Sequence, residues 1–321
     1  MQPPGGGAEA IHSRAHLPAF FLGMVYQTSR ADINHTDWDR MTGGTGYAFA
    51  ALVCYGLGDF IYKRATAAGV KPHHFLVGQA WFFAPAVILY AWATGALVFS
   101  RAALWGGLAG LFIFIGFYQF LRALGSGAVS IVAPIFRLNF LITAALAIVI
   151  LGEPLRLAMP LALALALAAI WLLLGGLDRR TTIDRGSLAA VSVATLSLGA
   201  ANFFHTVGLR HGGAPETLLA AQAVVFTILS TAFLRMLDGV IAPPRAVFKH
   251  TAAAAAVLIF AFLFMLHGVA RGAASVLVPI TQMGFVVTAG LGVVALGEPM
   301  TLRKTAGLAA AVAALAILAF G

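Results

Sequence analysis

The residues with the greatest chemical potential in this sequence are the charged side chains within long apolar stretches. Arg137 lies near the middle of the stretch 128–151, where a guanidinium can hold a carboxylate or phosphate through two parallel hydrogen bonds. Asp59 lies in the stretch 45–64, one helical turn before Lys63. Asp59 can pair with Lys63 on its own helix, bind a proton or cation, or pair with Arg137. Arg137 favours an anionic or zwitterionic ligand, and the alternative is a structural pair with Asp59 or with backbone carbonyls.

Other polar side chains in these stretches could line a binding path or form hydrogen bonds between helices. They are Tyr118, Gln119, Asn139, Asn202, His205 and His267, with Gln79 and Gln222 as further possibilities. His73 and His74 flank the start of a stretch but have no acidic or cysteine neighbour in the sequence, so we expect no metal site there. The single cysteine, Cys54, excludes an intrachain disulfide and a cysteine-based metal cluster.

A Leu-Gly-Glu-Pro motif occurs twice, each time between two apolar stretches. It contains Gly152, Glu153 and Pro154 in the first copy and Gly297, Glu298 and Pro299 in the second. Glycine suits the left-handed residue that ends a helix, and proline suits the first position of the next helix, whose positive end favours the carboxylate. We interpret the motif as a helix–helix turn; the alternative is that Glu153 or Glu298 is a gate or a proton site. Pro134 and Pro279 each remove a backbone hydrogen bond inside a stretch, which bends the helix or frees a carbonyl toward a cavity.

The elements that must position these residues are membrane-spanning helices. Hydrophobic residues make up 61% of the 321 residues and charged residues only 10%, too few to coat soluble domains. Apolar runs long enough to cross a bilayer lie at about 45–64, 73–95, 103–123, 128–151, 156–176, 187–209, 215–236, 250–270, 273–296 and 301–320. The runs do not alternate as strands of a membrane β-barrel would. The basic residues stand singly and form no nucleic-acid-binding patch. The sequence therefore predicts an all-α, polytopic membrane protein with ten spans in a lipid bilayer.

The chain contains an internal repeat. Residues 127–154 align with residues 272–299, and half of the aligned positions are identical. Arg137 aligns with Gln282, so both copies carry a polar side chain at the same depth. We expect two halves, 42–177 and 186–321; because each has five spans, the second must cross the bilayer in the opposite sense. Inverted repeats are typical of secondary transporters with a substrate site near the midplane.

The repeated small-residue helix start, mid-span proline and Leu-Gly-Glu-Pro motif resemble the EamA-type, ten-helix branch of the drug/metabolite transporter superfamily, over essentially all of 42–321. The resemblance implies a metabolite exporter or exchanger. It also implies a central cavity lined by the first, third, fourth, sixth, eighth and ninth spans.

These features together favour a secondary transporter of a small molecule that works by alternating access. The sequence contains no phosphate-binding Gly-rich loop ending in Lys-Ser/Thr, so we expect coupling to protons or to exchange rather than ATP hydrolysis. The alternatives are a lipophilic-drug efflux pump, a lipid flippase, or a membrane subunit that does not transport. The acids are too scattered for a metal-dependent membrane enzyme, and we expect no enzyme activity and no cofactor.

Residues 1–41 differ from the rest because they are rich in Pro, Gly and acidic residues. We expect a disordered leader, and Met41 to be the biological start. Links after odd-numbered spans carry most of the basic residues, which predicts that both termini lie outside the cytoplasm. The family resemblance implies the opposite orientation. We expect the protein in a bacterial inner (plasma) membrane.

Overall fold

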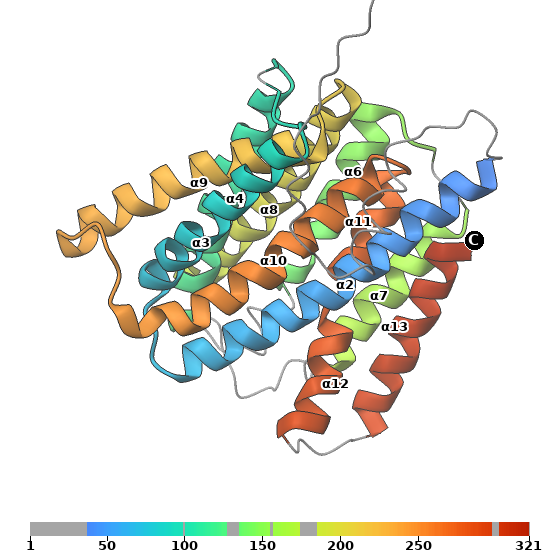
Figure 1. The fold of residues 1–321 in the computed structure, drawn as a ribbon. Helices are drawn as coiled ribbons and strands as arrows, with labels where there is room; N and C mark the ends of the chain where they lie inside the picture. The colour runs from blue at the N-terminus through green and yellow to red at the C-terminus, as the bar shows by residue number, and fades with distance from the viewer. Residues whose placement is uncertain are drawn as a thin grey trace, which may run out of the picture. The chain divides into compact units, whose positions relative to one another are not determined.

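The computed structural model describes residues 37–98, 100–126, 135–154, 157–173, 185–296 and 302–320. The helices are α2 (Asp37–Ala67), α3 (Pro72–Ala93), α4 (Ala103–Ser126), α6 (Asn139–Leu151), α7 (Met159–Leu173), α8 (Arg185–Arg210), α9 (Pro215–Asp238), η1 (Arg245–Val247), α10 (Phe248–Val269), α11 (Ala274–Gln282), α12 (Phe285–Leu296) and α13 (Leu302–Phe320) (Figure 1). Residues 1–36 of the predicted leader lie outside the described residues, and α2 begins before Met41.

The described part of the chain is entirely helical, as predicted. Five of its helical segments are long and apolar enough to cross a membrane: those of α3, α4, α8, α9 and η1–α10. Shorter apolar segments cover 135–151, 159–172, 274–288 and 305–320. The described helices thus occupy the ten predicted spans, and this confirms the predicted fold class.

Local sequence explains where several helices begin and end. Pro72 opens α3 and Pro215 opens α9, positions at which the missing proline N–H costs nothing. Gly152 ends α6 with a φ of 67°, and Gly239 ends α9 with a φ of 72°, both in the left-handed region that glycine adopts without strain. The prediction for Gly152 is therefore confirmed. Gly297 lies outside the described residues.

Two of the predicted spans are interrupted, and both are spans in which a proline was expected to bend the helix or free a carbonyl. In the ninth span, α11 ends at Gln282 and α12 begins at Phe285, with turn residues between them. In the fourth span, residues 135–137 are helical, Leu138 lies in a turn and α6 begins at Asn139. Pro279 lies within α11 shortly before the break, and Pro134 lies outside the described residues.

The two interruptions have the same hydrogen-bond pattern. The N–H of Leu138 bonds to the carbonyl of Ile135 at 3.1 Å, and the aligned N–H of Met283 bonds to Ile280 at 3.1 Å. The next i to i+3 bonds are also equivalent: the N–H of Leu141 donates to the carbonyl of Leu138, and the N–H of Val286 donates to the carbonyl of Met283. Such i to i+3 bonds within a helix often mark a hinge. The repeat in the sequence is therefore a repeat in backbone structure as well.

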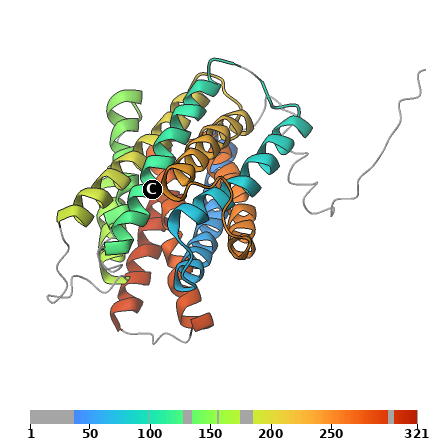
Figure 2. The same ribbon diagram turned by 90° about the vertical axis from the view of Figure 1, so that its left-hand side faces the viewer.

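The equivalent helices α3 and α9 pack against each other in opposite directions. His73 and His74, in the first turn of α3, contact Asp238 at the end of α9. Beyond the other end of α3, the N–H of Val98 donates to Thr217 near the start of α9 at 3.2 Å. Because the second helix of one half is antiparallel to that of the other, the halves are inverted. The last helices of the halves, α7 and α13, also lie side by side (Figures 1 and 2).

The first helix of each half packs against the interrupted span of the other half. Gly56 in α2 meets Gly284 at the break before α12, and the Thr288 hydroxyl donates to the Gly56 carbonyl at 2.9 Å. At the equivalent place, Gly199 in α8 meets α6, and the hydroxyl of Thr143 donates to its carbonyl at 3.2 Å. Small residues permit such close crossings in lipid.

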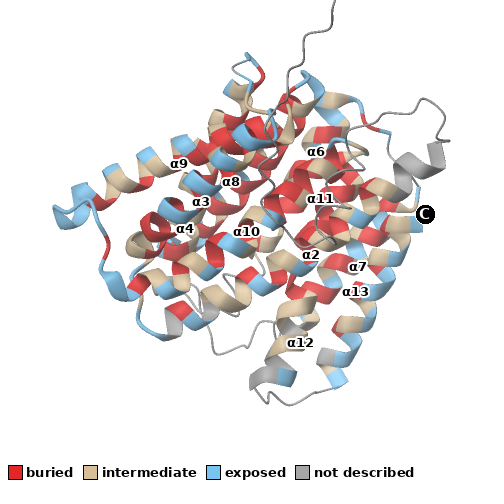
Figure 3. Cartoon of the chain, in the orientation of Figure 1, coloured by how far each residue is buried: buried red, intermediate tan, exposed pale blue. Residues whose placement is uncertain are grey.

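Burial follows this arrangement. Buried residues concentrate on α8 and α11, which pack against the other half (Figure 3). Elsewhere, large apolar side chains are exposed; Leu104 in α4 is 73% and Val149 in α6 is 80% exposed. An apolar outer surface of this kind fits a lipid environment.

Candidate functional site

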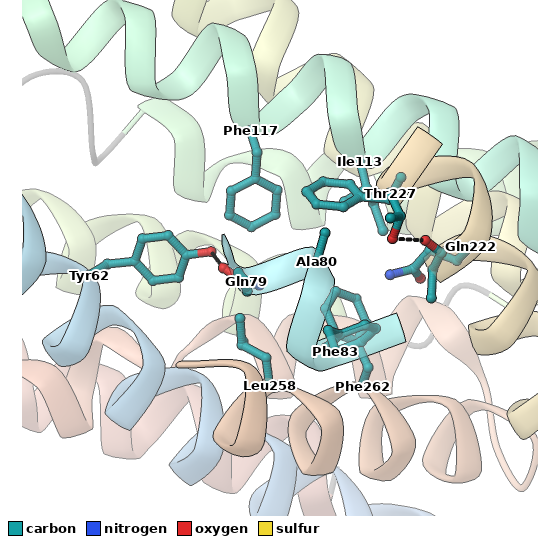
Figure 4. Close-up of a pocket in the computed structure, with 12 residues that line it drawn as sticks. Tyr62, Gln79, Ala80, Phe83, Ile113, Phe117, Gln222, Thr227, Leu258 and Phe262 are labelled. Carbon is teal, nitrogen blue, oxygen red and sulfur yellow. Dashed lines mark hydrogen bonds between the residues drawn. The ribbon is translucent and has the colours of Figure 1, made fainter. Parts of the chain in front are cut away.

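A small cavity lies between α3 and α9, with α2, α4 and α10 around it (Figure 4). Its volume is about 20 Å³, counted as the space that the centre of a water molecule can reach. This is enough for one water molecule but not for a metabolite. A solute can therefore enter only when the surrounding helices move apart.

The cavity is lined by equivalent residues from the two halves. From α3 and α9 the pairs are Gln79 with Gln222, Ala80 with Ala223, and Phe83 with Phe226. From α4 and α10 they are Ile113 with Leu258 and Phe117 with Phe262. Because five pairs of equivalent residues line it, the cavity lies on the axis that relates the halves. This is the location expected for a substrate site in an inverted-repeat transporter.

The two carboxamides of the cavity differ in their bonding. The Tyr62 hydroxyl donates a hydrogen bond to Oε1 of Gln79 (Figure 4). Gln222 is 2% exposed, and its Oε1 bonds to nothing among the described residues. His205 is 1% exposed and interacts with Gln222, but neither ring nitrogen reaches hydrogen-bond geometry within the described chain. Buried polar atoms without partners are rare, so this side of the cavity is suited to a polar ligand or a water.

Arg137 and Asp59 form an ion pair close to this cavity. The guanidinium contacts the Asp59 carboxylate, and the side chains are 14% and 33% exposed respectively. Arg137 is the last helical residue before the break in the fourth span. Of the three roles predicted for Asp59, the structure therefore favours the pair with Arg137, and the side chain of Lys63 lies outside the described residues.

Aromatic residues close to the ion pair in the chain reach the cavity wall. Tyr62 follows Asp59 by one turn of α2 and lies 6.1 Å, centroid to centroid, from the cavity residue Phe117. Phe117 lies 6.2 Å from Phe136, the neighbour of Arg137. Neither Arg137 nor Asp59 lines the cavity itself. Their part in binding remains a prediction.

The remaining predicted residues lie in several environments. Gln282 is 5% exposed, at the end of α11, and Asn139 is fully buried at the start of α6, where its Nδ2 donates to Phe136 at 2.8 Å. Asn202 is buried, and its Nδ2 has no partner among the described residues. The same holds for Oε1 of Gln119, whereas Tyr118 packs against Phe233 with ring centroids 4.4 Å apart. Of all these residues, only His205 contacts a cavity glutamine.

His267 belongs to a separate polar cluster. Its Nε2 lies 3.0 Å from the Glu216 carboxylate, and Arg271 donates to the His267 carbonyl at 2.8 Å. Tyr47 stacks on the imidazole ring. The cluster links α9 and α10 at the end where α9 begins. None of these residues lines the cavity, and a substrate-binding role for His267 stays a prediction.

The role predicted for the first Glu-Pro pair is wrong. Pro154 does not open the next helix, because α7 begins only at Met159. Glu153, 6% exposed, instead accepts hydrogen bonds from the N–H groups of Ala274 at 3.1 Å and Ser275 at 2.8 Å, at the start of α11 in the other half. The carboxylate still meets the positive end of a helix, but of a different helix. Glu298 and Pro299 lie outside the described residues.

His73 and His74, which have no acidic neighbour in the sequence, have one in the structure. Asp238 contacts both rings, although it is remote in sequence.

Most of the cavity lining was not recognised from the sequence. Gln79 and Gln222 were candidates, whereas Tyr62 and the phenylalanines were not. A signal was present: Gln-Ala-x-x-Phe occurs in both α3 and α9. Apolar residues repeated at equivalent positions are hard to distinguish from ordinary helix packing, which hides the phenylalanines.

Comparison with known proteins gives a consistent result. A family model described as the EamA-like transporter family matches residues 42–175 and 185–320. One solved crystal structure superimposes with a TM-score of 0.72 at 19% sequence identity, over 85% of this chain and 95% of that chain. At this identity the likeness shows the fold alone. No curated protein matches the sequence.

Proposed function

The chain belongs to the EamA-like transporter family, and we propose that it carries a small zwitterionic or anionic metabolite with an apolar side chain. The resemblance in the sequence is thereby confirmed. The protein is a membrane transporter and not an enzyme. Beyond family membership, we propose the class of solute and the place where the solute binds. We also propose that the membrane is a bacterial inner membrane.

The observation that carries the proposal is the Arg137–Asp59 pair beside an aromatic cavity. A zwitterion can insert between these two side chains, with its carboxylate on Arg137 and its ammonium on Asp59. The number of opposite charges in contact is then conserved, so no unpaired charge is buried. A simple anion would leave Asp59 without a partner, and a simple cation would leave Arg137 without one. The pair therefore favours a zwitterion over either.

The cavity favours an apolar or aromatic substituent on the same solute. Phe83, Phe226, Phe117 and Phe262 give it aromatic walls, and the two glutamines provide hydrogen bonds. Aromatic rings contribute both apolar area and edge-to-face contacts to a bound ring. We expect export or exchange, driven by protons or by a counter-solute, with the halves rocking about the paired helix crossings.

Counterflow in proteoliposomes loaded with unlabelled amino acids and organic acids tests this proposal. We expect exchange of labelled zwitterions with apolar side chains, and loss of at least about tenfold in rate for Arg137→Ala and Asp59→Asn, since each leaves the remaining charge of the pair, within a membrane span, without its partner. Arg245→Ala, at an exposed position in η1 outside the cavity lining, is the matched control for Arg137→Ala and should exchange normally.

Exchange of zwitterions at the native rate by both variants would remove the ion pair from the mechanism. Transport of lipophilic cations or of lipid, with no zwitterion exchange, would instead support a drug pump or a flippase.

A further inference from the structure

Two imidazoles and a carboxylate join the halves away from the cavity. His73 and His74 lie in the first turn of α3, and Asp238 is the last residue of α9. Nε2 of His73 lies 3.1 Å, and Nε2 of His74 lies 2.6 Å, from Oδ2 of Asp238. The three side chains are 17%, 12% and 26% exposed, so the packed helices hold them while an ion from solution can reach them.

We propose that His73, His74 and Asp238 form a binding site for a divalent cation of the zinc type. One ligand atom from each residue lies within 4.8 Å of the other two. Around a tetrahedral zinc ion with bonds of about 2.0–2.2 Å, ligand atoms lie roughly 3.4 Å apart. The cluster therefore needs only small side-chain rotations to admit an ion, and water can take the fourth position.

The chemistry of the ligands selects the class of metal. Two imidazole nitrogens and one carboxylate oxygen suit Zn²⁺, Co²⁺ or Ni²⁺. Mg²⁺ and Ca²⁺ prefer sites made entirely of oxygen ligands. The site therefore discriminates by ligand type against the abundant alkaline-earth ions.

The two rings already converge on one point. A single carboxylate oxygen of Asp238 lies near Nε2 of both rings, whose centroids are 4.6 Å apart. Neutral imidazoles are the form that binds metals. The negative end of α9 at Asp238 also favours a cation. Lys71 interacts with Asp238 as well, but it is exposed and can turn into solvent when an ion binds.

An ion at this site would tie the start of α3 to the end of α9, and so one half to the other at one membrane face. It would stabilise the conformation in which these two helix ends meet. The site is distinct from the cavity and does not depend on the proposed solute.

Zinc titration of the purified, tag-free full chain in detergent tests the proposal, with binding followed by equilibrium dialysis and stability by thermal unfolding. We expect one saturable Zn²⁺ per chain and a higher melting midpoint. Asp238→Asn and His74→Gln should each weaken binding by at least about tenfold. His211→Gln is the matched control, because His211 is an exposed histidine at the end of α8. Unchanged affinity in both site variants, or no saturable binding to the native chain, would overturn the proposal.

A second measurement needs no variant. Carbethoxylation of histidines in the native chain, mapped by mass spectrometry, should be reduced by Zn²⁺ at His73 and His74 but not at His211. Equal modification of His73 and His74 with and without Zn²⁺ would refute the site even if the variants failed to fold.

Discussion

Replacement of Gly56 by alanine tests whether the halves meet through the close helix crossing at Gly284. A Cβ added at Gly56 lies 2.5 Å from the carbonyl oxygen of Gly284 and 2.5 Å from Cβ of Val287. Since one of these neighbours is backbone, the helices themselves must move apart. Overpacking costs about 1–3 kcal/mol, and the lengthened bond from Thr288 adds about 1 kcal/mol, while alanine returns up to about 1 kcal/mol of helix propensity. The expected net loss is roughly 2 kcal/mol.

Gly46→Ala is the matched control, because a Cβ added at this position of the same helix meets nothing within 4 Å. The gain in helix propensity is common to both variants, so they should differ by the overpacking and the lengthened bond, roughly 3 kcal/mol. At about 2–4 °C for each kcal/mol, Gly56→Ala should melt roughly 6–12 °C below Gly46→Ala in detergent. Gly199→Ala should resemble Gly56→Ala, since its added Cβ lies 2.6 Å from Cβ of Ile142 at the equivalent crossing. If Gly56→Ala and Gly46→Ala melt together, the helices do not cross as closely as described, and the argument for the paired crossings fails.

Two further predictions concern the polar contacts between helices. Glu153→Gln should lower the free energy of unfolding by about 2 kcal/mol or more, because two charge-assisted bonds to the start of α11 are lost, whereas Arg210→Gln should cost less than about 1 kcal/mol because Arg210 is 42% exposed; equal thermal shifts for the two variants would contradict this. Tyr62→Phe should shift the conformational equilibrium away from the present state by about 1 kcal/mol, roughly fivefold, because it removes the bond to Gln79. Labelling of a cysteine introduced at Thr227, in a Cys54→Ser background, by impermeant reagents from each membrane face measures the shift; unchanged labelling would show that the bond does not favour either state.

Features that depend on neighbouring residues could be predicted from the sequence. The spans follow from hydropathy over short windows, and the left-handed Gly152 follows from the end of one helix. The repeat is visible because aligned residues such as Thr143 and Thr288 are identical, and in the structure both make the same contact with the other half. The number, order and inversion of the helices were therefore accessible before any coordinates.

Features that depend on residues distant in the chain could not be predicted. The sequence placed Glu153 at the start of its own next helix, because only adjacent helices are visible in a linear pattern. The structure shows that its carboxylate reaches α11, which lies in the other half. Asp238 meets His73 and His74 for the same reason. In both cases the residue types indicated the kind of contact, but the sequence did not indicate the partner residue.

Arg137 is an intermediate case. Its depth in the span was predictable, and so was the possibility of a pair with Asp59. The position of the pair relative to the cavity was not predictable, because it depends on which aromatic rings pack beside the pair. Phe117 and Phe136 pack against each other, and nothing in their spacing distinguishes them from core residues. Helix packing therefore decides whether a charged side chain within a span lines a cavity or is kept from it by other side chains.

The unequal bonding of the two cavity glutamines follows from the symmetry of the halves. His205 lies as far beyond Gly199 in α8 as Tyr62 lies beyond Gly56 in α2, so the two residues are equivalent partners for Gln222 and Gln79. Only the Tyr62 pair is bonded in this structure. Alternating access in an inverted repeat exchanges the environments of the two halves. We therefore infer that in the opposite conformation Gln222 bonds with His205 while Gln79 is released, and the Tyr62→Phe measurement tests the first half of that exchange. A solute that bonds to whichever glutamine is free would find one polar partner in either state.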